Sequence, residues 1–216
     1  MSKRSINIQN TKKNGGYRDE LKNQIVLTAA RLFRTNGIRS VKMDDIVGHL
    51  SCSKRTLYEL FKDKEALVLA VANYLHSLDM EKIDKFSLEA HDIMDIILES
   101  FKIQLENFRV TNPQYYYDLH KYPQVERLLV KHHNDLFNDI LNVFETGVKE
   151  GFFRPDIDYN IMIDVFMGRE QRVVTSKLYM KYSLTDIFKN SILVEMRGIC
   201  TEKGLKSLDD FTKRNF

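Results

Sequence analysis

The segment from Gly37 to Leu67 constrains the fold of this chain more than any other stretch of it. Its apolar residues recur at the three- and four-residue spacing of one helix face, and short polar turns interrupt that pattern twice. The pattern predicts a helix over about 42–50, a second that begins after Ser53 and a third that begins after Asp63. Both residues are suitable N-caps, because a hydroxyl or carboxylate oxygen can accept a backbone N–H of the first helical turn.

The middle helix of this segment carries side chains suited to nucleic acid. Its exposed sides present Lys54, Arg55, Thr56 and Tyr58, which can donate hydrogen bonds to base edges or to phosphates. Two short helices joined by a tight polar turn, with this chemistry on the second, predict a helix-turn-helix that reads DNA. The charge agrees, because residues 1–62 hold 13 Lys and Arg against 5 Asp and Glu. A basic segment is expected where one end of a protein meets phosphates.

The rest of the chain is also predicted to be helical. Only three prolines and nine glycines interrupt the 216 residues, and no strand alternation competes with the helical spacing. The apolar stripes predict helices over about 19–36, 64–78, 93–108, 125–144, 158–180 and 184–203. We therefore expect an all-α fold in four parts: a flexible basic arm (1–17), a helix-turn-helix DNA-binding domain (18–64), a connecting helix (65–81) and a C-terminal helical domain (82–216).

Several classes of protein are not favoured by the sequence. No apolar run approaches the roughly 18 residues needed to span a bilayer, and the polar N-terminus does not look like a secretion signal. Cys52 and Cys200 lack a ligand-like spacing, which favours a reducing compartment, so we expect a cytoplasmic protein without a membrane partner. No nucleophile with a base, paired carboxylates or phosphate-binding glycine loop indicates an enzyme or a cofactor. His132 and His133 diverge on a helix, so no metal site is expected.

Residues 19–80 resemble the DNA-binding domain of the TetR family of transcriptional regulators. The first helix ends with Phe33 before Gly37, and Ile46 follows in the second helix, as in that family. The family's recognition helix and the start of its next helix are matched without a gap by Ser53, Lys54, Thr56, Leu57, Tyr58, Phe61, Lys64, Glu65 and Leu67. The chain departs from the family at Val41 and Lys42, where Thr is usual, at Ser51, which replaces a turn glycine, and at Arg55, which replaces a small residue.

The resemblance implies a role for each DNA-facing residue. Lys54 and Arg55 would reach base edges in the major groove, and Arg suits the paired acceptors of guanine. Thr56 would contact a base or a phosphate. Tyr58 and Lys64 match residues that bond phosphates in the family. Lys42 can keep a phosphate contact as a point charge, but it cannot cap a helix as Thr does, which leaves Ser40 as the alternative cap.

For the C-terminal domain, the resemblance implies a pocket for a small-molecule effector and a homodimer formed by the last two long helices. Such a protein, usually a repressor, binds a palindromic double-stranded DNA operator. Aromatic residues suited to an apolar or flat ligand are Phe101, Phe108, Tyr116, His120, Phe137 and Phe166, with Tyr115 and Tyr117 in the same run. The alternatives are that these side chains belong to the core, that the protein binds DNA without sequence choice, or that it is a helical interaction protein without an effector.

Overall fold

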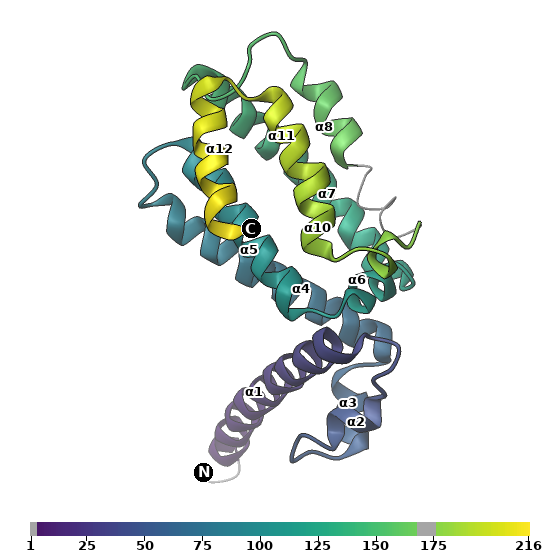
Figure 1. The fold of residues 1–216 in the computed structure, drawn as a ribbon. Helices are drawn as coiled ribbons and strands as arrows, with labels where there is room; N and C mark the ends of the chain where they lie inside the picture. Colours follow the sequence, from purple (N-terminus) through teal and green to yellow (C-terminus); the bar gives the residue numbers. More distant parts are fainter. Residues whose placement is uncertain (1–3, 168–175) are drawn as a thin grey trace.

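The computed structural model describes residues 4–167 and 176–216, and apart from one isolated bridge this part of the chain forms no β-structure (Figure 1). The helices are α1 (Arg4–Asn36), α2 (Met43–Val47), α3 (Lys54–Leu60), α4 (Lys64–Ser87), α5 (Ile93–Val110), α6 (Pro113–Leu119), α7 (Pro123–Lys149), α8 (Tyr159–Met167), η1 (Leu178–Met180), α10 (Leu184–Phe188), η2 (Lys189–Leu193), α11 (Val194–Ile199) and α12 (Glu202–Asn215). The predicted all-α class is confirmed. None of the described helices is long and apolar enough to cross a membrane.

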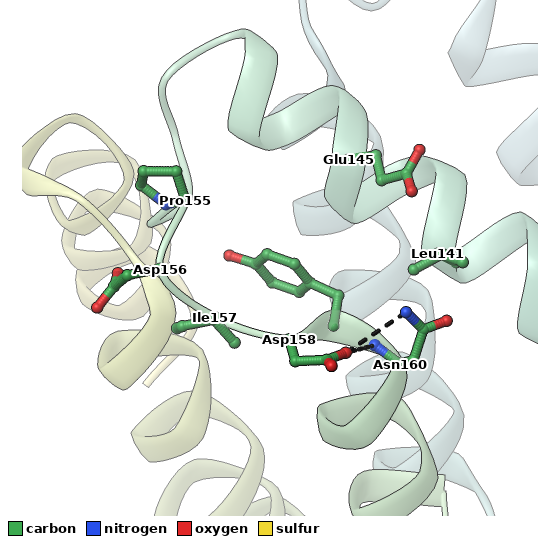
Figure 2. A pocket seen from close by; sticks show the side chains of 8 residues that line it. Leu141, Glu145, Pro155, Asp156, Ile157, Asp158 and Asn160 are labelled. Carbon is green, nitrogen blue, oxygen red and sulfur yellow. Dashed lines mark hydrogen bonds between the residues drawn. The ribbon is translucent and has the colours of Figure 1, made fainter.

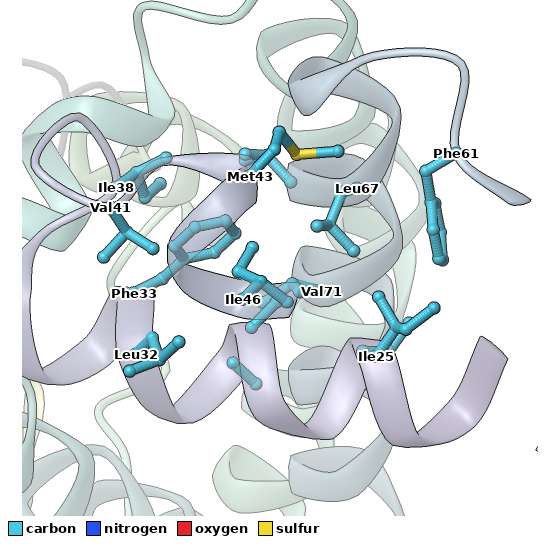
Figure 3. Close-up of a cluster of buried hydrophobic side chains, with 14 of the residues drawn as sticks. Ile25, Leu32, Phe33, Ile38, Val41, Met43, Ile46, Phe61, Leu67 and Val71 are labelled. Carbon is cyan, nitrogen blue, oxygen red and sulfur yellow. The ribbon is translucent and has the colours of Figure 1, made fainter. Parts of the chain in front are cut away.

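Helices α1, α2 and α3 form a head at one end of the molecule, and α4 leads from it into the body (Figure 1). The head is held by a cluster of buried apolar side chains, here called the head core, several of which Figure 3 shows converging. Its fully buried members are Ile25, Ala29, Phe33, Ile38, Ile46, Leu57, Leu67, Val68, Val71 and Val125. Burial of one such large side chain contributes roughly 1.5–3 kcal/mol, so this shared core fixes the orientation of α3.

The two predicted N-caps are confirmed. Ser53 Oγ accepts the Thr56 N–H at 3.1 Å, and an Asp63 oxygen accepts the Ala66 N–H at 2.8 Å. Gly37 ends α1 with a φ of +80°, a conformation that glycine adopts without a steric cost. These local signals therefore place the starts of α3 and α4 and the end of α1.

The start of α2 differs from the alternative that Ser40 caps it. Lys42 is the N-cap residue, and its N–H donates to the Asp45 carboxylate at 2.6 Å. The Ser40 hydroxyl instead donates to the carbonyl oxygens of Asn36 and Gly37 at the end of α1. Ser40 is thus too early in the loop to reach α2, and the carboxylate three residues after the N-cap supplies the missing partner.

Helix α1 is longer than the sequence pattern indicated. Its backbone is helical from Arg4, so residues 4–17, expected as a flexible arm, form its first turns. The two glycines at 15 and 16 lower helix propensity by roughly 1 kcal/mol each, but no proline blocks propagation from the strongly packed part of the helix. The Gly15-Gly16 pair is therefore not the boundary that the sequence suggested.

The body is built around a second cluster, here called the body core. Its best-buried members are Met94, Leu105, Phe152, Phe153, Ile163, Phe188, Leu193, Met196, Leu208 and Phe211. Two helices outside the head, α6 and α12, were not predicted from the sequence. Helix α6 starts with Asn112 as N-cap and Pro113 in its first turn, and α12 is capped by Thr201.

The predicted helix over 184–203 ends earlier, at Ile199. Cys200 is extended, with φ −75° and ψ 147°, and the backbone there pairs with the segment after α7. Arg154 N–H donates to Ile199 O and Thr201 N–H donates to Phe152 O, both at 2.9 Å. This bridge separates α11 from α12. The helix predicted over 158–180 is described only in part: α8 runs to Met167, residues 168–175 lie outside the described residues, and a turn with η1 follows.

Candidate nucleic-acid interface

Helix α3 presents a polar face because its apolar face is anchored in the head core. Leu57 is buried completely, and Phe61, at the end of the helix, is 3% exposed. Residues that lie off this apolar stripe must face solvent, since a helix turns by about 100° per residue. Lys54, Arg55 and Tyr58 are accordingly exposed, as the sequence pattern predicted.

Lys54 lies at the first turn of α3 and pairs with Asp44 of α2. Its Nζ is 2.8 Å from an Asp44 carboxylate oxygen, and both side chains are exposed. The hydrogen bond and the charge of Asp44 raise the pKa of Lys54 above its usual value. The ammonium is therefore held at the α2–α3 corner of the head, where an incoming acceptor would compete with one carboxylate.

Arg55 is the most exposed of these side chains, with 88% of its side-chain surface accessible. Its Nε donates to Glu59 Oε1 at 2.9 Å one turn later on α3. This exposed pair uses Nε. Among the residues that the structure describes, the two terminal nitrogens of the Arg55 guanidinium have no hydrogen-bond acceptor. An arginine in this state is suited to the bidentate recognition of guanine.

Thr56 and Tyr58 occupy different environments on the same helix. The Thr56 hydroxyl lies 2.8 Å from Ser53 Oγ, and its side chain is partly buried. Thr56 therefore belongs to the capped first turn as well as to the candidate DNA face. Tyr58 is 44% exposed, and an exposed phenol is able to donate to a phosphate oxygen.

The two lysines predicted to contact phosphates are not equivalent. Lys42, the N-cap residue of α2, is exposed. The Lys64 ammonium instead donates to the backbone oxygen of Val41 and lies 5.9 Å from the centre of the Phe33 ring. Burial, the largest influence, lowers the pKa of Lys64. Lys64 thus ties the first turn of α4 to the α1–α2 loop, and a phosphate would have to compete with a carbonyl for it.

Three of the predicted effector residues come together in the body with two residues that the sequence analysis did not select. Phe101 lies 5.3 Å from Phe188 and 6.3 Å from Phe211, ring centre to ring centre. Phe108 lies 5.7 Å from Tyr116 and 6.4 Å from Phe188. We call these five rings the aromatic column. Phe211 was missed because it belongs to the unpredicted α12, and Phe188 because its position in the apolar stripe indicated only core packing.

The other predicted effector residues lie in separate settings. His120 Nδ1 is 2.7 Å from a Glu126 carboxylate oxygen, and Phe137 packs, partly buried, against the body core. The Phe166 side chain lies outside the described residues. The sequence therefore grouped residues that the fold divides among the aromatic column, a histidine–glutamate hydrogen bond and the body core.

Two of the surface hollows on the described part of the chain can be compared with the predicted effector residues, and none of these residues lines either of them. One, of about 460 Å³, lies between α7, which supplies Leu141 and Glu145, and the segment from Pro155 to Asn160 (Figure 2). Its Asp158 is occupied in accepting the Asn160 N–H at 3.0 Å. The other, of about 470 Å³, lies on the head between the end of α1 and α2. The aromatic column is thus a packed structure and not the wall of either hollow.

Comparison with known proteins finds similarity to a family over part of the head and the start of α4. Residues 25–71 match the bacterial regulatory proteins of the tetR family. The uncharacterized HTH-type transcriptional regulator YerO of Bacillus subtilis (strain 168) is 29% identical over 93 residues, which are 42% of this chain and 32% of that protein. The chain therefore spans about a third of the length of this relative.

Solved structures share the fold over most of the chain. A protein from Saccharomonospora viridis, crystallised in complex with choline, has a TM-score of 0.68 at 19% identity and covers 85% of this chain and all of its own. A TetR-family transcriptional regulator from Cytophaga hutchinsonii has a TM-score of 0.63 at 14% identity, covering 86% of this chain and 98% of its own. At these identities, the likeness extends to the fold of both head and body.

Proposed function

We propose that the chain is a regulator of the tetR family, whose members match its residues 25–71, and that it binds a palindromic double-stranded DNA operator as a homodimer and represses transcription. The observation that carries the proposal is the exposed polar face of α3, with Lys54, Arg55 and Tyr58 on a helix whose other face is locked into the head core. A helix held in this way can enter the major groove as a rigid unit.

The proposed contacts divide by the chemistry of each side chain. Arg55 reads a guanine through its guanidinium fork, and Lys54 reaches a base edge after leaving Asp44. Tyr58 and Lys42 hold phosphates and so fix the register of the helix on the duplex. Thr56 and Lys64 act at the same face, but each is also engaged within the head. These two are therefore expected to contribute less to DNA affinity than Arg55.

The proposed homodimer uses the body helices nearest the C-terminus. Ile161 and Val165 on α8 are 64% and 67% exposed, and Val194 on α11 is 57% exposed. Ile161 and Val165 lie one turn apart on the same face of α8, and an exposed apolar helix face is typical of protein interfaces. A two-fold dimer would present two copies of α3 to half-sites one helical turn apart, which is the geometry that a palindrome requires.

We also infer control by a small-molecule effector bound in the body. The aromatic column would connect such a site to the head, since Tyr116 packs against the head core while Phe188 and Phe211 belong to the C-terminal helices. The S. viridis protein of the same fold holds choline. Phe101, Phe108 and Tyr116 remain the candidate contacts, and His120, Phe137 and Phe166 are secondary ones. An effector that prefers a form with wrongly spaced α3 helices would shift the population away from the operator.

Selection of bound DNA from a random pool tests this function. Enrichment of a palindrome supports a dimeric, sequence-specific regulator. The alternative is a helical protein that binds DNA through its basic head without sequence choice, and that protein would enrich no sequence and would lose affinity steeply with salt.

A further inference from the structure

Helix α6 connects the head to the body through two neighbouring tyrosines, which both pack against the head core while one of them also joins the aromatic column. Tyr115 is 4% exposed and lies in the head core together with Leu119. The neighbouring Tyr116 meets Phe108 of α5 in the aromatic column, with ring planes nearly perpendicular. A displacement of the column would therefore move a helix that is itself part of the head core.

The last turn of α6 carries Asp118, a completely buried carboxylate. One of its oxygens accepts the backbone N–H of Arg39 at 2.8 Å, and the other accepts the Gln114 side-chain amide at 2.8 Å. Buried charged groups are retained only when hydrogen bonds replace their hydration. The bond to Arg39 is the one that leaves α6, and it ends on the α1–α2 loop, which comprises residues 37–42.

The α1–α2 loop has little freedom to move independently of α6. A side chain at Gly37 would place its Cβ 3.0 Å from Gln114 Cγ, so the loop backbone lies directly against α6. Farther along the loop, the Val41 oxygen accepts the Lys64 ammonium and the Lys42 N–H donates to Asp45 of α2. The bond from Asp118 to Arg39 is thus followed, within three residues, by the contacts that start α2.

A second link between body and head lies on the other side of α1. The Arg34 guanidinium donates to Thr111 Oγ1 at 2.9 Å and to Asn107 Oδ1 at 3.1 Å, both near the end of α5. This link holds the end of α1, whereas Asp118 holds the chain after α1. Of these two links, the one through Asp118 is the hydrogen bond that reaches the segment leading into the helix-turn-helix.

We propose that Asp118 is a positioning residue for DNA binding: through its hydrogen bond to the Arg39 amide, α6 sets the placement of α2 and α3 relative to the body. The proposal rests on the proposed function, because it assigns the control of the same DNA-reading face. In the form that binds DNA, the aromatic column keeps α6 in place and Asp118 holds the α1–α2 loop. A rearrangement of the column that withdraws α6 releases the loop, and α3 loses its fixed placement.

Backbone amide exchange of the full chain without DNA gives the first test. Asp118→Leu keeps the branched shape of the side chain but removes the acceptor, and we expect at least about tenfold faster exchange at Arg39 and along α2, since these amides lose their shared restraint. Asp118→Asn retains one acceptor oxygen and should restore most of the protection. Gln114→Met, which removes the other hydrogen bond of Asp118 and no bond to the loop, serves as the matched control and should resemble the wild type.

Operator affinity gives the second test, at a temperature where every variant is shown to be folded. Asp118→Leu should weaken operator binding by about tenfold or more, with rescue by Asp118→Asn, as expected when a restraint on the reading helix is lost. Faster exchange at Arg39 with unchanged operator affinity would assign Asp118 a stabilising role only and overturn the proposal. Unchanged exchange along α2 would overturn it as well.

A change at the far end of the connection tests the proposal even if Asp118→Leu does not fold. Phe108→Leu lies in the aromatic column, away from the loop, and should still increase exchange at Arg39 by about threefold, because α6 loses its support. An unchanged exchange rate of the Arg39 amide in this variant would contradict the proposed connection from the aromatic column to the α1–α2 loop. If the wild type selects no operator, the proposed function fails, whereas the exchange measurements still decide whether the body controls the loop.

Discussion

Replacement of Arg55 by alanine separates sequence reading from stability more cleanly than any other change on α3. The Arg55 side chain is 88% exposed, and its ion-pair partner is Glu59, one turn later on the same helix. An exposed pair of this kind is worth roughly 0.3–0.5 kcal/mol, so the free energy of unfolding should change by no more than about 0.5 kcal/mol. A bidentate contact to guanine is worth roughly 1–3 kcal/mol, which corresponds to about a 5- to 150-fold loss of operator affinity. Because Arg55 must first leave Glu59, we expect a loss in the lower half of that range.

The assay is a set of competitive titrations with the selected operator, operators changed at single base pairs, and random DNA. Arg55→Ala should lose discrimination at one base pair of each half-site and lose little affinity for random DNA. Arg55→Lys keeps the charge without the fork and should recover affinity but not discrimination. Glu59→Gln removes only the partner and should bind at least as tightly as the wild type. Equal losses on operator and random DNA for Arg55→Ala would refute the base-reading role.

Three further changes test other parts of the structure. Lys64→Met keeps the buried stem of the side chain but removes the hydrogen bond to Val41, so the free energy of unfolding in chemical denaturation should fall by about 1 kcal/mol. DNA titrations should show a similar loss of affinity for all sequences. An unchanged free energy of unfolding would show that this hydrogen bond does not stabilise the fold. Val165→Glu places a charge on the proposed dimer face and should shift sedimentation toward monomer without lowering thermal stability of the fold; an unchanged dimer would exclude this face. Burial raises the pKa of the Cys200 thiol from 9.0 to about 11, so the contribution of Cys200 to stability is complete below about pH 9 and is lost as the pH rises through about 11. Across that pH interval, the free energy of unfolding measured with urea should fall more steeply for the wild type than for Cys200→Ala. Parallel pH dependences would show that Cys200 is not the group responsible.

Short-range signals account for the parts of the fold that could be predicted. Ser53 and Asp63 each satisfy an amide three residues later, so the sequence pattern alone located the starts of α3 and α4. Helix α12 escaped prediction because its apolar stripe is narrow: Leu208 and Phe211 are buried within an otherwise polar helix. Helix α6 escaped because it is short and begins with a proline, and its three tyrosines do not form a single amphipathic face.

The candidate site was predictable in composition but not in its internal contacts. Exposure of Arg55 and Tyr58 follows from their offset from Leu57 on one helix. The bond from Lys64 to Val41 spans 23 positions of sequence, and the bond from Asp118 to Arg39 spans 79. Contacts of that range depend on tertiary packing, which the helical spacing of a sequence does not specify. The sequence also could not show that the predicted effector residues lie in different settings, since aromatic composition does not distinguish a pocket wall from rings packed against each other.

Two copies of α3 that read a palindromic sequence should bind a duplex according to how many intact half-sites it carries. A titration with three duplexes tests this dependence. The wild type is titrated at physiological salt with the selected palindrome, with the same DNA carrying one scrambled half-site, and with a fully shuffled duplex. We expect the intact palindrome to bind about a thousandfold or more tightly than the shuffled duplex, and the DNA with one scrambled half-site to bind with an affinity between these two. Equal affinity for all three, falling together as salt rises, would contradict it.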